Sequence, residues 1–101
     1  MALTGLELEV TTRFHARPGA EDALDRAIRG IVPLVREEPH CLGVRAYRAT
    51  DDRRLFVIAS RWSEEAAYQR HHALARTKEF LELVQSLVDE PIRSDRLRAI
   101  E

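Results

Sequence analysis

Four side chains with acid–base or aromatic chemistry lie within a short stretch of the sequence: Trp62, Tyr68, His71 and His72. An imidazole titrates near neutral pH, so it can remove a proton from a phenol or an activated carbon. If this stretch is helical, both histidines lie near Tyr68, because positions three and four apart share one side of a helix. Adjacent helical residues point about 100° apart, so at most one histidine is expected to face a pocket. The spacing therefore predicts one general base beside aromatic side chains, and it leaves open which histidine that is.

The sequence does not indicate metal or covalent chemistry. Adjacent histidines on a helix do not converge on one ion, and Cys41 is the single cysteine, so neither a thiolate metal site nor an internal disulfide is expected. The sequence contains no serine nucleophile elbow, glycine-rich phosphate loop or CxxC pair. We therefore expect no metal and no cofactor, and the hydrolase, kinase and thiol-redox classes are disfavoured.

Hydrophobic periodicity predicts the elements that position these residues. Alternating apolar side chains indicate strands, whereas apolar side chains that recur every three or four positions indicate amphipathic helices. In chain order, the expected elements are a strand over 6–15, a helix over 20–37, strands over 41–49 and 54–62, a helix from 63, a bend at 73–77, a further helical stretch up to 89, and an edge or exchanged strand over 92–100. This order is that of an α+β, ferredoxin-like βαββαβ fold with an antiparallel sheet.

Single residues predict two details of the helices. Ser63 is a good N-cap, and the acidic residues Glu64 and Glu65 that follow it suit the first turn of a helix. Pro33 falls inside the first helical pattern, where it removes a backbone donor. A kink or a loosened last turn is therefore expected near Pro33.

The strand over 54–62 is largely apolar on both faces. Alternation places Phe56 and Trp62 on one face and Val57 and Ala59 on the other. An antiparallel sheet with helices on one side normally shows its other face to water, so two apolar faces suggest that a second subunit covers one of them. Dimerisation would also bury apolar surface that such a small fold cannot cover alone. We therefore expect a homodimer.

The bulk composition is ordinary for one soluble domain spanning residues 1–101. The chain is 45% hydrophobic and 33% charged, with a net charge of -1 and a pI near 6.4. This charge balance produces no field that attracts nucleic acid or anionic lipid. The N-terminus has no basic stretch followed by a long apolar core, and no apolar run approaches the roughly 20 residues of a membrane span. We expect a cytoplasmic protein with no nucleic-acid or membrane partner.

Several ordered motifs carry a resemblance to a known family. They are Arg17-Pro18-Gly19 ahead of the first helix, Arg36-Glu37-Glu38-Pro39-His40-Cys41-Leu42-Gly43 between that helix and the second strand, and Trp62 followed nine residues later by His71, with Phe80 beyond. In this order and spacing, the chain resembles the antibiotic biosynthesis monooxygenase domains, which include quinol and anthrone oxygenases. The resemblance covers nearly the whole chain.

The resemblance implies a dimeric α+β barrel, in which two sheets face each other and each subunit holds an apolar pocket between its sheet and its helices. It also implies oxidation of an electron-rich substrate (aromatic polyketide-like, anthrone or quinol) by molecular oxygen, without metal or flavin. A deprotonated, electron-rich ring can itself donate an electron to oxygen. The protein then needs only to remove a proton and keep the anion dry.

Two positions depart from the family pattern. Many members carry Glu where this chain has Ser60 and Gly where it has His40. Ser60 cannot supply the charge of a carboxylate, so the family mechanism need not transfer unchanged. Haem-degrading relatives place their ligand histidine about one helix segment further on, near Leu81, where this chain has no imidazole. Haem degradation is therefore disfavoured.

The leading hypothesis is a cofactor-independent monooxygenase with His71 as the general base. Trp62 is expected to stack on a flat substrate or to donate a hydrogen bond to a developing oxyanion, although a core position is the alternative. The other candidates for substrate contact are Tyr68, His72, Phe56 and Tyr47. Two further functions remain open: an isomerase or cyclase that enolises a carbonyl compound in the same pocket, and a non-catalytic dimer that binds a small ligand.

Overall fold

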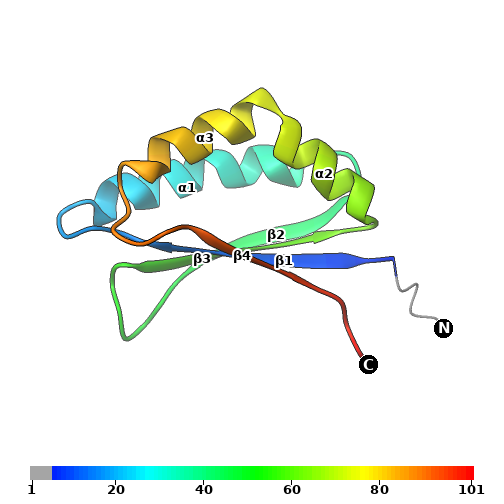
Figure 1. The fold of residues 1–101 in the computed structure, drawn as a ribbon, viewed down its shortest axis with the longest axis horizontal. Helices are drawn as coiled ribbons and strands as arrows, with labels where there is room; N and C mark the ends of the chain where they lie inside the picture. Colours follow the sequence, from blue (N-terminus) through cyan, green and yellow to red (C-terminus); the bar gives the residue numbers. More distant parts are fainter. Residues whose placement is uncertain (1–5) are drawn as a thin grey trace.

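The computed structural model describes residues 6–101, which form one antiparallel sheet with three helices packed on one of its faces (Figure 1). In chain order, the elements are β1 (Leu8–His15), α1 (Glu21–Arg36), β2 (Cys41–Arg48), β3 (Leu55–Trp62), α2 (Glu65–Ala73), α3 (Ala75–Gln85) and β4 (Arg93–Leu97). The strand order in the sheet is β2-β3-β1-β4, and every neighbouring pair is antiparallel. This is the ferredoxin-like α+β fold that the sequence predicts, with the second helical segment divided into α2 and α3.

The register of β1 against β3 determines which side chains enter the core. The pairing runs from Leu8 opposite Trp62 to Phe14 opposite Phe56, and all four residues are buried. Because side chains alternate along a strand, these residues share the face that the helices cover. The buried side of α1 consists of Leu24, Ile28, Val32 and Val35. Their spacing of three and four positions is that of an amphipathic helix, so α1 can pack flat against the sheet.

The start of α2 differs from the sequence prediction, whereas the kink expected near Pro33 in α1 stays a prediction. α2 has Glu64 as its N-cap residue and no side-chain cap, so the prediction that Ser63 caps this helix is wrong. The backbone N–H of Ser63 instead donates to the carbonyl oxygen of His40, which ties this residue to the start of β2. α1 continues through Pro33 and ends at Arg36. Pro33 and Arg29 are both exposed, so water can bond the Arg29 carbonyl that lacks a proline N–H partner.

The helical stretch after β3 bends where expected and ends earlier than expected. Leu74 is extended and separates α2 from α3, within the predicted bend at 73–77. α3 ends at Gln85 rather than at residue 89, because the chain beyond it bonds to the end of β1 instead. Arg17 N–H donates to the Leu87 carbonyl at 2.9 Å, and Asp89 N–H donates to the His15 carbonyl at 3.0 Å. Tertiary pairing thus replaces the last predicted helical turn.

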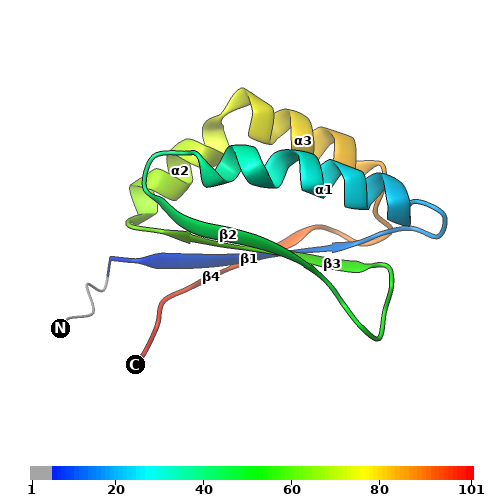
Figure 2. The same ribbon diagram turned by 180° about the vertical axis from the view of Figure 1, so that it is seen from behind.

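The sheet face opposite the helices is uncovered within the described residues (Figure 2). Tyr47, which pairs with Val57, lies on this side and is 49% exposed, and Leu97 of the edge strand β4 is 45% exposed. Val57 and Ala59 of β3 are partly exposed on this face, as the alternation along that strand predicts. The homodimer expected from this face stays a prediction.

Candidate active site

A cavity of about 350 Å³ lies between the helices and the sheet. Its apolar walls include Phe14, Ile31, Val35, Ile58, Phe80 and Leu81. Its polar or titratable side chains include Thr12, Ser60, Tyr68, His71, His72 and Ser94. Such a composition, mostly apolar with a few converging polar groups, is typical of a small-molecule site.

His71 is held at the cavity by a buried carboxylate. Its Nδ1 lies 2.9 Å and 3.1 Å from the two carboxylate oxygens of Glu38, which follows α1 in the chain. The Glu38 side chain is only 4% exposed and that of His71 only 14%. A carboxylate can only accept hydrogen bonds, so Nδ1 carries the proton and donates it to Glu38. Within residues 6–101, all hydrogen bonds of this imidazole go to Nδ1, which leaves Nε2 as the basic nitrogen for a bound molecule.

The surroundings keep His71 in its neutral form. Burial lowers the pKa of His71 below its usual value, because desolvation disfavours the imidazolium. The nearby Glu38 carboxylate opposes this change, whereas His72 and Arg76 add to the lowering of the pKa. A neutral imidazole with one free ring nitrogen is the form that a general base requires.

Tyr68 provides a protonated phenol beside this base. It lies one turn before His71 on α2, and the two ring centroids are 5.8 Å apart. Burial raises the pKa of Tyr68, although Arg96 and a side-chain hydrogen bond with Ser94 oppose the shift. The Ser94 hydroxyl lies 3.0 Å from that of Thr12, so β4 and β1 both support the phenol. Tyr68 therefore stays a hydrogen-bond donor at neutral pH.

Trp62 lies behind the site rather than in it, which differs from the expectation that it contacts substrate. Its side chain is fully buried and is not part of the cavity wall. The indole Nε1–H donates to Ser60 Oγ at 3.0 Å, so it is not available to an oxyanion. The Trp62 ring packs 4.9 Å from the His71 ring. Trp62 therefore supports the imidazole by packing, and Ser60 serves as its hydrogen-bond acceptor.

The remaining predicted site residues divide into two groups. His72 also lines the cavity, which differs from the expectation that at most one histidine faces a pocket, but it is exposed whereas His71 is largely buried. Phe56 and Tyr47 do not line the main cavity, contrary to the expectation that they contact its ligand. Both lie at a smaller hollow beside β2, where the Arg48 guanidinium is stacked 4.8 Å from the Phe56 ring.

Glu38 is the residue of the candidate site that the sequence does not reveal. An acidic residue just after a helix is normally exposed to solvent, so the sequence gives no reason to expect Glu38 in a buried site. Only the packing of α2 against this turn brings Glu38 into contact with His71. Ser60 on β3 cannot supply a carboxylate to this site. Glu38, in the turn after α1, places a carboxylate there instead. Ser94 and Thr12 are likewise unremarkable until β4 pairs with β1.

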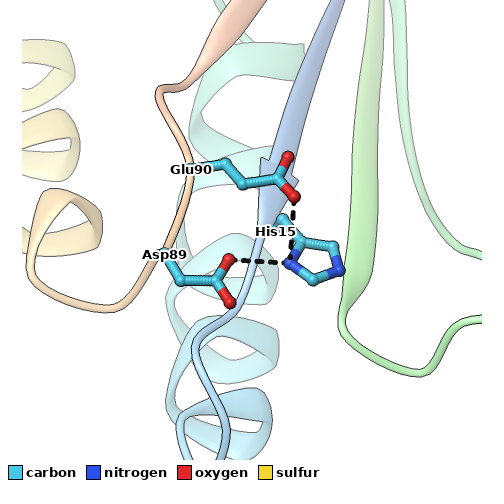
Figure 3. Close-up of side chains that lie close together, drawn as sticks. All are labelled: His15, Asp89 and Glu90. Carbon is cyan, nitrogen blue, oxygen red and sulfur yellow. Dashed lines mark hydrogen bonds and ion pairs between the residues drawn. The ribbon is translucent and has the colours of Figure 1, made fainter.

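A second charged cluster surrounds His15 at the other end of β1 (Figure 3). His15 Nδ1 lies 2.7 Å from Asp89 Oδ1 and 3.7 Å from Glu90 Oε2, and its Nε2 lies 2.9 Å from Asp52 Oδ2. Hydrogen bonds to Asp89 and Asp52 raise the pKa of His15. The Arg54 guanidinium, 3.1 Å from the other oxygen of Asp89, adds a second cation. The cluster thus places two cations among three carboxylates, and we interpret it as an ion-pair network that joins β1, the β2–β3 hairpin and the segment after α3.

Comparison with known families agrees with this fold. The family model for antibiotic biosynthesis monooxygenase matches residues 8–83, more than half of the chain. The chain belongs to the antibiotic biosynthesis monooxygenase family. The matched residues include the whole His71–Glu38 pair and Tyr68, whereas β4 with Ser94 lies beyond the match. No curated protein is significantly similar to this chain.

Solved structures share the complete fold of this family member. PA3566 from Pseudomonas aeruginosa is 25% identical, with a TM-score of 0.88, and the match covers 99% of this chain and 100% of that one. Rv0793 from Mycobacterium tuberculosis is 22% identical, with a TM-score of 0.88 and coverage of 94% and 96%. A putative antibiotic biosynthesis monooxygenase from Nitrosomonas europaea is 15% identical, with a TM-score of 0.90 and coverage of 99% and 96%.

Among residues 6–101, no helix has the length and apolar character needed to cross a membrane.

Proposed function

We propose that the cavity is the active site of a cofactor-independent monooxygenase, which oxidises an aromatic polyketide-like, anthrone or quinol substrate with molecular oxygen. One observation carries the proposal: His71 lines a mostly apolar cavity and is fixed through Nδ1 by the buried Glu38, so Nε2 is left to act as the base. The arrangement is that of a general base oriented by a carboxylate. The family match supports the general activity.

The chemistry needs only the substrate, oxygen and these side chains. His71 Nε2 takes a proton from the substrate, and the resulting electron-rich anion donates an electron to oxygen. Combination of the two radicals and loss of water then gives the product. For an anthrone, the methylene and one O₂ become a carbonyl and one water, so the balance requires no external reductant. The apolar walls contribute by excluding water from the anion.

Tyr68 complements the base in this proposal. As a protonated phenol beside His71, it can donate a hydrogen bond to the oxyanion that forms when the substrate loses its proton. Ser94 and Thr12 hold the phenol from the sheet, and Trp62 packs against the imidazole. The volume of about 350 Å³ lies at the small end of the range for ligand pockets, which favours a compact planar substrate.

The same base and donor also suit an isomerase or cyclase that enolises a carbonyl compound. This alternative is favoured by the pairing of His71 with Tyr68, because a base and a hydrogen-bond donor one helical turn apart are the two groups that enolisation needs. Its reaction consumes no oxygen. Oxygen dependence therefore separates the two functions.

We also propose that the chain is a homodimer through its open sheet face. The exposed Tyr47 and Leu97 and the apolar strand β3 support this, because large apolar side chains on a sheet face are normally covered.

The test is oxygen uptake by the purified, metal-stripped protein with a panel of anthrones and hydroquinones, followed by mass spectrometry under labelled oxygen. We expect uptake above the protein-free control and label in the product. His71→Ala should lower turnover by roughly 10²-fold or more, whereas the matched variant His72→Ala should change it much less. Equal losses in both variants would refute the assignment of His71. An anaerobic conversion of the substrate would favour the isomerase, and binding without conversion would favour a ligand-binding dimer.

A further inference from the structure

The Glu38 carboxylate is shared between the active-site imidazole and a cation at the surface. Glu38 Oε1 accepts from His71, and Oε2 accepts from Arg76 Nη2 at 3.0 Å. The same Arg76 nitrogen lies 3.2 Å from the Leu34 carbonyl, so Arg76, at the start of α3, is also fastened to α1. Arg76 is 40% exposed on its side chain and does not line the cavity. Arg76 therefore acts on the site from outside the cavity, through its contact with Glu38 and through its charge near His71.

A buried carboxylate needs a positive partner, and two partners are available here. While Arg76 provides the positive charge, His71 can remain neutral and still donate Nδ1–H to Glu38. Without Arg76, the most accessible compensating cation is His71 itself, which would take up a proton on Nε2. That proton would occupy the nitrogen that acts as the base.

We propose that Arg76 is a positioning residue of this site: it neutralises Glu38 from the surface and so keeps His71 a neutral acceptor toward the cavity. The inference deepens the proposed function and rests on it for its catalytic meaning. The geometry alone predicts the proton balance of His71, with or without a known substrate.

The other charged or titratable groups around His71 do not replace Arg76. On α2, His72 adds positive charge when protonated, and Tyr68 is a neutral phenol. On β4, Arg96 is held 5.2 Å from the Tyr68 ring and pairs with Glu65 at 2.9 Å. Arg76 is the cation that contacts Glu38 among the described residues.

The experiment is an NMR titration of the four histidine imidazoles in the full chain, with His71 assigned from His71→Ala. Arg76→Ala and Arg76→Gln remove the charge, Arg76→Lys retains it, and Arg70→Ala removes an exposed arginine of α2 as the matched control. We expect the His71 midpoint to rise by about one pH unit in both charge-removing variants. Arg76→Lys should restore most of the change, and Arg70→Ala should leave the midpoint in place.

Rate measurements then separate this inference from the proposed function. With an active substrate, the acid limb of kcat/KM should move to higher pH in Arg76→Ala, and the rate on the alkaline side should recover to the wild-type value. A purely structural defect would lower the rate at every pH and would overturn the inference. An unmoved His71 midpoint in folded Arg76→Gln would also overturn it, while leaving the oxygenase proposal standing. A shifted midpoint without oxygen uptake would support the inference and count against the oxygenase alone.

Discussion

The substitution Glu38→Gln tests the central arrangement most directly, because it removes one negative charge and almost no volume. Glu38 fixes His71 as the tautomer with its proton on Nδ1. A glutamine can turn its NH₂ group toward Nδ1, so the imidazole proton moves to Nε2 and the base faces the wrong way. A comparable loss of tautomer control in a carboxylate–histidine–nucleophile site costs about 10⁴-fold in turnover. We expect a fall of roughly 10²-fold to 10⁴-fold here.

The same substitution should also destabilise the fold. A hydrogen bond to a charged group contributes about 1.5–3 kcal/mol when it is buried, and the Glu38–His71 bond is buried. The Arg76 contact is partly exposed and adds less. We therefore expect a loss of about 2 kcal/mol in the free energy of unfolding. For a chain of this length, that corresponds to a fall in Tm of about 10 °C.

Two measurements check this prediction, with Glu37→Gln as the matched control, because Glu37 is the exposed neighbour. Initial rates across the pH range give the loss of turnover, and imidazole ¹⁵N shifts report the tautomer of His71 without any substrate. Wild-type turnover in Glu38→Gln, together with an unchanged ¹⁵N pattern, would refute the claim that Glu38 orients the base. A loss of stability of the same size in Glu37→Gln would refute the energetic part.

Three further substitutions have definite expected outcomes. His15→Asn should destabilise the protein more near pH 6 than near pH 9. Because the pKa of His15 is raised in the folded protein, its ion pairs contribute fully below the unfolded pKa and are lost as the pH rises through the folded pKa. Denaturant unfolding that shows an equal effect at both pH values would contradict the network. Trp62→Phe should lower the free energy of unfolding by about 2–3 kcal/mol, because it removes buried volume and the hydrogen bond to Ser60. It should leave the affinity for planar ligands nearly unchanged. A selective loss of ligand affinity would show instead that Trp62 contacts the ligand. His40→Gly should stabilise the protein by about 0.5–1 kcal/mol, because His40 has a φ of 66°, a backbone conformation that is strained for a residue with a side chain. A lower Tm would show that the contacts of the His40 side chain contribute more than this strain costs.

Much of the fold could be predicted from the sequence, because it depends on local periodicity. The alternation through β1 and β3 and the recurrence of apolar residues along α1 specify one buried face for each element. Polar residues at 50–53 mark the hairpin between β2 and β3. Errors occurred at helix ends, where a few hydrogen bonds decide the boundary. Ser63 and the residues after Gln85 follow tertiary partners, the His40 carbonyl and the end of β1, rather than local preference.

The candidate site could be predicted only in part. The sequence by itself determined that both histidines of α2 would lie near Tyr68, because helical spacing requires it. It could not show that Trp62 uses its N–H on Ser60, because both side chains point to one face of β3 and their contact depends on rotamers. Nor could it show which acid serves the imidazole. Glu38 and His71 are far apart in the chain, and only the packing of α2 over the turn after α1 removes both from water. The chemistry of the carboxylate–histidine pair depends on that shared burial, so it was decided by the tertiary structure.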